Sequence, residues 1–118
     1  MKFPPFAVKM ENGIRVNGSL VIPTVVTMAE GLDAGRYRLL AKLQLAEPGK
    51  GRHPGLLRNY LADANCDAAQ IRVTVPGYTE QVGFELEQIQ VYARFVLLDR
   101  VTGYRSQAQE NAFVIKVV

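Results

Sequence analysis

The sequence has no tryptophan, one cysteine and one histidine. Because Cys66 is alone, no disulfide can form within the chain, which fits a reducing compartment. A closed zinc site needs several cysteine or histidine ligands, and Cys66 with His53 cannot supply them. No acidic stretch has the spacing of a calcium-binding loop. We therefore expect neither a metal nor a cofactor.

Long apolar runs are also missing from the sequence. No stretch approaches the ~18 apolar residues of a membrane helix. The first residues, Met1 to Phe6, lack the continuous apolar segment of a signal peptide. The prediction is a cytoplasmic protein that does not associate with membranes.

No catalytic motif is recognisable. His53 and Cys66 could act as base and nucleophile only if the fold brought them together. Glu85 and Glu87 lie on one polar strand face, whereas an acid–base pair needs two carboxylates in different environments. Gly49-Lys50-Gly51 does not complete a phosphate-binding P-loop. We therefore expect no enzymatic activity.

The composition is ordinary for one globular domain. The chain has 118 residues, of which 48% are hydrophobic and 21% are charged. Neither a repeat nor a linker divides it, so we predict a single β-rich domain over residues 1–118. The net charge of +3 permits attraction to polyanions without requiring it.

Alternating apolar and polar residues predict strands along much of the chain. The clearest pattern covers residues 37–45, where the odd positions are apolar and most even positions are polar. Similar patterns cover residues 71–75, 89–97 and 113–117. Asp99 to Gly103 is expected to form a hairpin loop. The whole chain then holds six or seven strands.

Two Asn-Gly pairs lie near the start of the chain. Asn-Gly suits a tight turn because both positions tolerate positive φ. We predict a hairpin turn at Asn12-Gly13, between residues 6–10 and 14–16, and either a turn or a bulge at Asn17-Gly18. Pro23 should interrupt the next strand or place it at a sheet edge.

One short helix is predicted at about 55–64. Leu57, Tyr60, Leu61 and Ala64 share a face at helical spacing. Short connections favour antiparallel pairing, and the fold class is then mainly β, as a small antiparallel barrel or a sandwich. A helix after the third strand is compatible with an oligonucleotide-binding-type (OB-like) barrel. No residue motif supports that topology, so no family is assigned.

Basic residues lie on the polar strand faces and in a glycine-containing loop at residues 47–55. Single-stranded nucleic acid binds surfaces that combine cations with aromatic rings. We therefore predict a non-catalytic protein that binds single-stranded DNA or RNA, with Tyr92 stacking on a base. The expected phosphate contacts are Arg36, Arg38, Lys42, Lys50, Arg52, Arg58, Arg72 and Arg94. Solvated strand faces also carry arginine, so the pattern is compatible with a plain surface.

The alternative is a β-rich protein–protein interaction or assembly module without a nucleic-acid role. Leu40, Val96 and Leu98 fall on strand faces that are otherwise polar. Such residues suggest a surface that another protein or a second copy covers. The alternative therefore includes a homodimer and an accessory or inhibitor protein.

Overall fold

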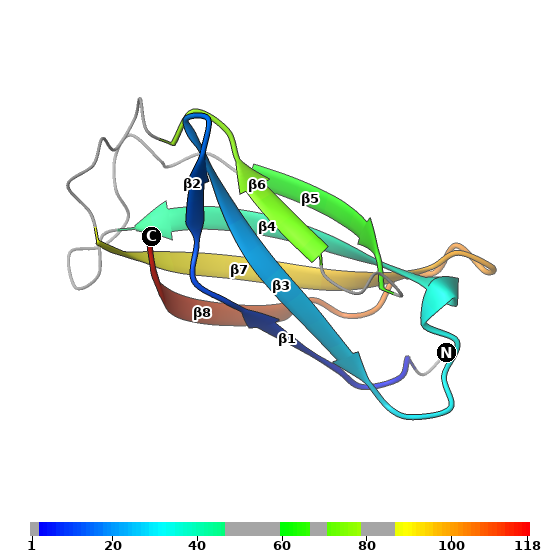
Figure 1. Ribbon diagram of the computed structural model, residues 1–118. Helices are drawn as coiled ribbons and strands as arrows, with labels where there is room; N and C mark the ends of the chain where they lie inside the picture. Colours follow the sequence, from blue (N-terminus) through cyan, green and yellow to red (C-terminus); the bar gives the residue numbers. More distant parts are fainter. Residues whose placement is uncertain (1–2, 47–59, 67–70, 79–86) are drawn as a thin grey trace.

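The computed structural model describes residues 3–46, 60–66, 71–78 and 87–118 (Figure 1). This part of the chain is mainly β, with one 3-10 turn, η1, at Ala34–Arg36. Its strands are β1 (Phe6–Met10), β2 (Ile14–Val16), β3 (Ser19–Met28), β4 (Tyr37–Ala46), β5 (Tyr60–Asn65), β6 (Ile71–Val75), β7 (Gln88–Asp99) and β8 (Gln109–Lys116).

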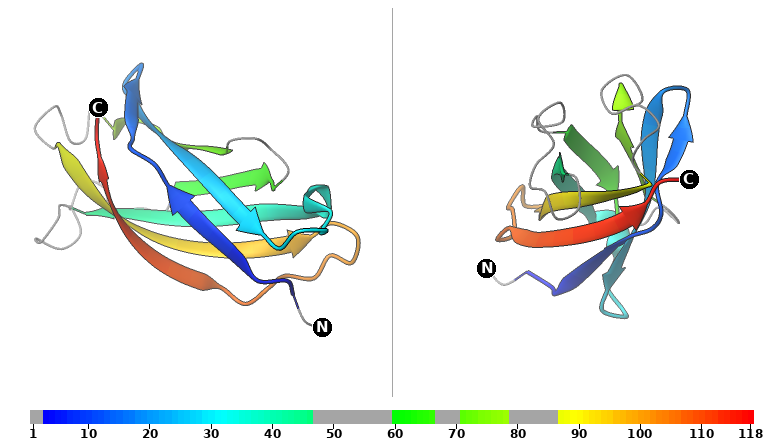
Figure 2. Two further views of the ribbon diagram at one scale, coloured as in Figure 1. Left: turned by 60° about the horizontal axis from the view of Figure 1, so that its bottom comes forward. Right: turned by 90° about the vertical axis from the view of Figure 1, so that its left-hand side faces the viewer.

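The strands form two antiparallel sheets of four strands each. In the first, here called the β7 sheet, the order is β5-β4-β7-β8. In the second, the β3 sheet, β1, β2 and β6 all pair with β3. Figure 1 shows β3 crossing obliquely in front of β4 and β7, and the end-on view in Figure 2 shows the two layers. The fold is therefore a sandwich, as one of the two predicted architectures required.

The first hairpin, formed by β2 and β3, has its turn at Asn17-Gly18, the second of the two Asn-Gly pairs. Asn17 and Gly18 have φ values of 50° and 81°, as a two-residue turn of the primed type requires. β1 and β2 both lie antiparallel to β3, so the predicted hairpin turn at Asn12-Gly13 is wrong. The register with β3 shifts by one residue between the two strands, and residues 11–13 therefore form a bulge in one interrupted strand. Asn-Gly chemistry is the same at both sites, so the sequence pattern could not separate turn from bulge.

This interrupted strand also joins the two sheets. The Gly13 N–H donates to the Lys116 carbonyl at 2.8 Å, and the Val118 N–H donates to the Gly13 carbonyl at 2.8 Å. These bonds form a parallel bridge to the end of the chain, beyond β8. At the opposite side of the sandwich β5 and β6 lie close, but no hydrogen-bonded ladder joins them among the described residues. The sandwich is consequently not a closed barrel.

The core lies between the two sheets. Odd positions of β4 and β7, such as Leu43, Leu45 and Phe95, are fully buried, as the alternation predicted. Even positions of β3, including Leu20 and Ile22, cover them from the other layer. Even positions of β4 and β7 therefore point away from the core.

The helix predicted at about 55–64 is wrong over its described part. Tyr60–Asn65 is the strand β5, which pairs with β4 from Leu43↔Tyr60 to Arg38↔Asn65. Tyr60, Ala62 and Ala64 face inward, whereas Leu61 is 75% exposed. A short apolar run fits both the helical and the strand period. Pairing with the edge of β4 gives this segment the strand conformation. Residues 55–59 lie outside the described residues.

The loop at Asp99 to Gly103 is a hairpin turn, as predicted. The Asp99 carboxylate accepts hydrogen bonds from the backbone N–H groups of Val101 (2.9 Å) and Thr102 (3.3 Å). Gly103 has a φ of 77° and donates to the Asp99 carbonyl. Within the described residues, no helix has the length and apolar character needed to span a membrane.

Candidate nucleic-acid interface

The site lies on the face of the β7 sheet that points away from the core. It is formed by the even positions of β4, β7 and β8 and the odd positions of β5, because the alternate positions fill the sandwich. We call this surface the outer face. Its centre is a continuous ladder, since β4 and β7 pair without interruption from Tyr37↔Asp99 to Ala46↔Gln90.

Cross-strand pairing brings three of the predicted residues together here. Lys42 lies directly opposite Arg94, and Arg94 lies opposite Glu110 on β8. In the next row Gln44 lies opposite Tyr92. Directly opposed side chains in antiparallel sheets are close neighbours. The sheet therefore places a ring and two cations in adjoining rows.

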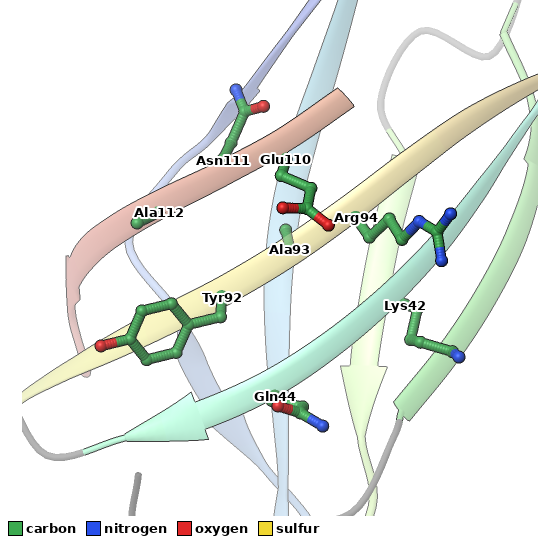
Figure 3. Close-up of a pocket in the computed structure, with 8 residues that line it drawn as sticks. All are labelled: Lys42, Gln44, Tyr92, Ala93, Arg94, Glu110, Asn111 and Ala112. Atoms are coloured by element: carbon green, nitrogen blue, oxygen red, sulfur yellow. The ribbon is translucent and has the colours of Figure 1, made fainter. Parts of the chain in front are cut away.

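These residues surround a shallow hollow of about 370 Å³, which is called the tyrosine hollow below. Its lining is Lys42, Gln44, Tyr92, Ala93, Arg94, Glu110, Asn111 and Ala112. Figure 3 shows the Lys42 and Arg94 side chains extending to the same side, toward β5, while the Tyr92 ring extends the opposite way. Lys42 and Arg94 are exposed and Tyr92 is half-buried.

A second hollow of about 590 Å³ adjoins the first and shares Lys42 and Arg94 with it. We call it the leucine hollow. It is lined by Leu40, Ala41, Lys42, Leu61, Ala62, Asp63, Arg94, Val96, Arg105, Ser106 and Ala108. Leu40, Leu61 and Val96 supply apolar surface on the outer face, between neighbouring strands. Lys42 and Arg94 thus lie between the tyrosine hollow, which contains an aromatic ring, and the leucine hollow, which has aliphatic walls.

Arg36 and Arg38 have carboxylate partners in the structure. The Arg36 Nε and Nη2 groups donate to the two Asp99 oxygens at 3.0 and 2.7 Å. The Arg38 Nε donates to Asp63 Oδ1 at 2.7 Å, and its Nη1 donates to Asn65 Oδ1 at 3.0 Å. The hydrogen bond that Arg38 donates to Asp63 raises the pKa of Arg38 above its ordinary value. Both arginines thus have a structural role that the sequence pattern did not indicate.

The remaining predicted cations are not part of this cluster. Arg72 is exposed on β6, opposite Pro23 of β3, and so belongs to the other sheet. Lys50, Arg52 and Arg58 lie outside the described residues. Of the predicted phosphate contacts, the structure therefore brings only Lys42 and Arg94 beside Tyr92, among the described residues.

Several residues of the two hollows were not predicted from the sequence. Gln44 has the same even phase as Lys42, and that phase could have indicated it. Leu61 was assigned to a helix and reaches the outer face only because β5 is a strand. Arg105 follows the hairpin, and its bridge to Leu98 brings it to the edge of the sheet. Such a bridge leaves no periodic signal.

The groups on this face are of kinds that make non-covalent contacts. The described residues hold no group of three or more His, Cys, Asp or Glu that could bind a metal ion. Cys66 is buried, and His53 lies outside the described residues. What the face offers is a phenol ring, exposed cations, an amide and aliphatic surface.

Comparisons with known proteins assign neither a family nor a function to the chain. No protein-family model matches the chain, and no curated protein matches it. Among solved structures, the chain is similar to the crystal structure of MtrC from Shewanella baltica OS185, with a TM-score of 0.46 and 12% sequence identity. The match covers 96% of this chain and 22% of that chain. At this distance the likeness carries no argument about function.

Proposed function

We propose that the chain binds single-stranded nucleic acid, without catalysis, on the outer face of the β7 sheet. The observation that carries the proposal is the tyrosine hollow, where Tyr92 adjoins the cross-strand pair Lys42 and Arg94. A base can stack on the ring while the neighbouring phosphates meet the two cations. We also propose that the protein is cytoplasmic, because its one cysteine, Cys66, is buried and cannot form a disulfide within the chain, which suits a reducing compartment.

The charge of the outer face, counted over the described residues, supports a polyanionic ligand. Its cations are Arg38, Lys42, Arg94, Arg105 and Lys116, and its carboxylates are Asp63 and Glu110. Asp63 is already engaged by Arg38. Glu110 adjoins Arg94, where a carboxylate can accept a hydrogen bond from the amino group of a base. The face therefore attracts phosphates and still offers polar groups to base edges.

Fluorescence anisotropy with labelled single-stranded and duplex DNA and RNA across a salt series tests the proposal. We expect single strands to bind more tightly than duplexes. Tyr92→Ala should weaken single-strand binding by about 5- to 150-fold, because stacking is worth roughly 1–3 kcal/mol per base. Lys42→Ala should reduce the slope of log affinity against log salt by about 0.7, the value for one phosphate contact.

Arg72→Ala is the matched control for Lys42→Ala. Both variants remove one positive charge from an exposed strand residue, but Arg72 lies on the β3 sheet. We expect Arg72→Ala to leave the salt slope nearly unchanged. Equal losses for the two variants would show that only net charge matters, and no binding at low salt would refute the proposal.

A second candidate function, self-assembly, is favoured by the outer face of the β3 sheet. Ile14, Val16 and Val25 are 47%, 44% and 39% exposed there. The nearby charges of Lys9 and Glu11 form an ion pair with each other at 3.8 Å. This face also carries the cation Arg72, opposite Pro23. A face rich in β-branched residues can pack against its own copy in a symmetric dimer. Light scattering would give the mass, and a dimer that Val16→Lys dissociates, but Val101→Lys in the hairpin loop does not, would support this candidate.

A further inference from the structure

We propose that the leucine hollow receives a second base of the same nucleic-acid strand. The strand then runs along β4 and β7, and its backbone passes over Lys42 and Arg94. This inference rests on the proposed function and adds the direction of the strand and a second base site. It follows from the order of the rows on the outer face.

The rows are ordered along the strands. Tyr92, Arg94 and Val96 follow one another on the same face of β7, with Gln44, Lys42 and Leu40 opposite them on β4. Tyr92 and Val96 are four residues apart, which is about 13 Å at a rise of roughly 3.3 Å per residue. That span is about four times the 3.4 Å axial rise per nucleotide of one duplex strand, the shortest rise to allow for. A segment of at most about four nucleotides therefore covers both hollows.

The leucine hollow offers apolar walls to a flat group. Leu61 on β5 is 75% exposed and lies directly opposite Lys42. Leu40 and Val96 oppose each other in the next row and are half-buried. Isolated exposed leucines are common on protein surfaces, but this one continues an apolar surface inside a hollow. Burial of that surface by the face of a base would remove it from water.

The charges around this hollow favour an anionic strand over other occupants with apolar groups. Lys42 and Arg94 border it on the side of the tyrosine hollow, and Arg105 lines it as well. Among the described lining residues, the one carboxylate is Asp63, which accepts from Arg38 at 2.7 Å and so presents a balanced charge. A ligand that filled both hollows would carry an anion between two flat or apolar groups. A nucleic-acid strand has this arrangement at each nucleotide.

The test compares Leu61→Ser with Val114→Ser in the anisotropy assay with labelled oligothymidylates of increasing length. Val114 is 57% exposed on β8 of the same outer face but lines neither hollow. We expect Leu61→Ser to weaken binding of the longer oligonucleotides by about tenfold, for the lost apolar contact, and to leave the shortest ones unaffected. Val114→Ser should bind as the wild type does, and Leu61→Met should retain most of the affinity. Because Leu61 is largely exposed, these variants should keep the wild-type circular dichroism spectrum.

The outcomes separate this inference from the proposed function. If Tyr92→Ala loses binding while Leu61→Ser binds every length as the wild type does, the second base site is refuted and the proposed function stands. The leucine hollow would then be open to a protein partner instead. Equal losses for Leu61→Ser and Val114→Ser would also refute it, since no specific contact would be involved. If the wild type binds no oligonucleotide, the proposed function fails first.

Discussion

At the scale of single residues, the Asp99 carboxylate has the most distinctive environment among the described residues. Its side chain is 2% exposed, and both oxygens accept from the Arg36 guanidinium. The hydrogen bond from Arg36 is the largest cause that holds the pKa of Asp99 well below its ordinary range, and the N–H groups of Val101 and Thr102 add to it. The same contacts fix the start of β4 against the β7 hairpin. Asp99 is thus a structural residue that supports one end of the outer face.

Asp99→Asn should lower the stability of the fold at neutral pH and make it less sensitive to acid. A carboxylate with a lowered pKa in the folded state stabilises above its unfolded pKa of about 3.9. That stabilisation is lost as the pH falls from about 4 toward the lowered value. Urea denaturation at several pH values should therefore show a gap between wild type and variant that is largest near pH 7 and narrows below about pH 4.

Asp63→Asn is the control for this comparison. The Asp63 carboxylate also accepts from an arginine, but its side chain is 53% exposed. Exposed ion pairs contribute little to stability, so this variant should lose much less than Asp99→Asn. A stability gap between wild type and Asp99→Asn that stayed constant from pH 7 to pH 2 would contradict the role assigned to the carboxylate.

Residue roles on the outer face were only partly predictable. The alternation in residues 37–45 correctly separated core from surface, so Tyr37 is buried and Lys42 is exposed. It could not distinguish Arg38, which has an acidic partner 25 positions away, from Lys42. Strand pairing alone decides which side chains meet across the sheet, and the period along one strand contains no information about that. The cluster of Lys42, Arg94 and Tyr92 became visible only with the β4–β7 register.

At the scale of elements, the sequence pattern is ambiguous where a segment fits both the helical and the strand period, or where a turn and a bulge use the same residues. The sequence of β5 predicted a helix because its apolar residues fit both the helical and the strand spacing. The bulge between β1 and β2 was predicted to be a turn because Asn12-Gly13 consists of two residue types that are common in turns. Its structural reason is different: Gly13 lies where β3, the interrupted strand and the end of the chain meet. Such a three-way contact depends on residues more than a hundred positions apart.

Gly13→Ala should therefore destabilise the fold. A Cβ at this position would lie 2.6 Å from Leu20 Cδ1 and 3.6 Å from Ile115 Cδ1. Leu20 is fully buried, so it has little room to move. We expect a loss of about 1–3 kcal/mol in the free energy of unfolding, as for other overpacked cores. Urea denaturation measures it.

Thr27→Ala on the exposed face of β3 gives the matched comparison. It changes a side chain of the same sheet without touching the junction, and a surface change of this kind is expected to stay within about 0.5 kcal/mol. If Gly13→Ala proved no more destabilising than Thr27→Ala, the junction would have to be looser than its distances indicate.

At the scale of the whole molecule, the two sheets are joined on one side and separate on the other. The bridge at Gly13 links the β3 sheet to the end of the β7 sheet. On the opposite side β5 pairs only with β4, and β6 pairs only with β3, among the described residues. A closed barrel would have no such edges. The connectivity therefore distinguishes the sandwich from the barrel, which strand patterns in the sequence left open.

Native-state hydrogen exchange should report this asymmetry directly. Strand β7 pairs with β4 on one side and β8 on the other, so its amides should exchange slowest, with opening free energies close to that of global unfolding. The amides of β5 and β6 that point away from β4 and β3 have no ladder partner among the described residues and should exchange much faster. If those edge amides were protected as strongly as β7, a further ladder would have to close the seam, and the molecule in solution would be a barrel. Fast exchange at both edges would instead show that no ladder closes the seam between β5 and β6. The support of the outer face and its two hollows would then come from the joined side and the continuous β4–β7 pairing.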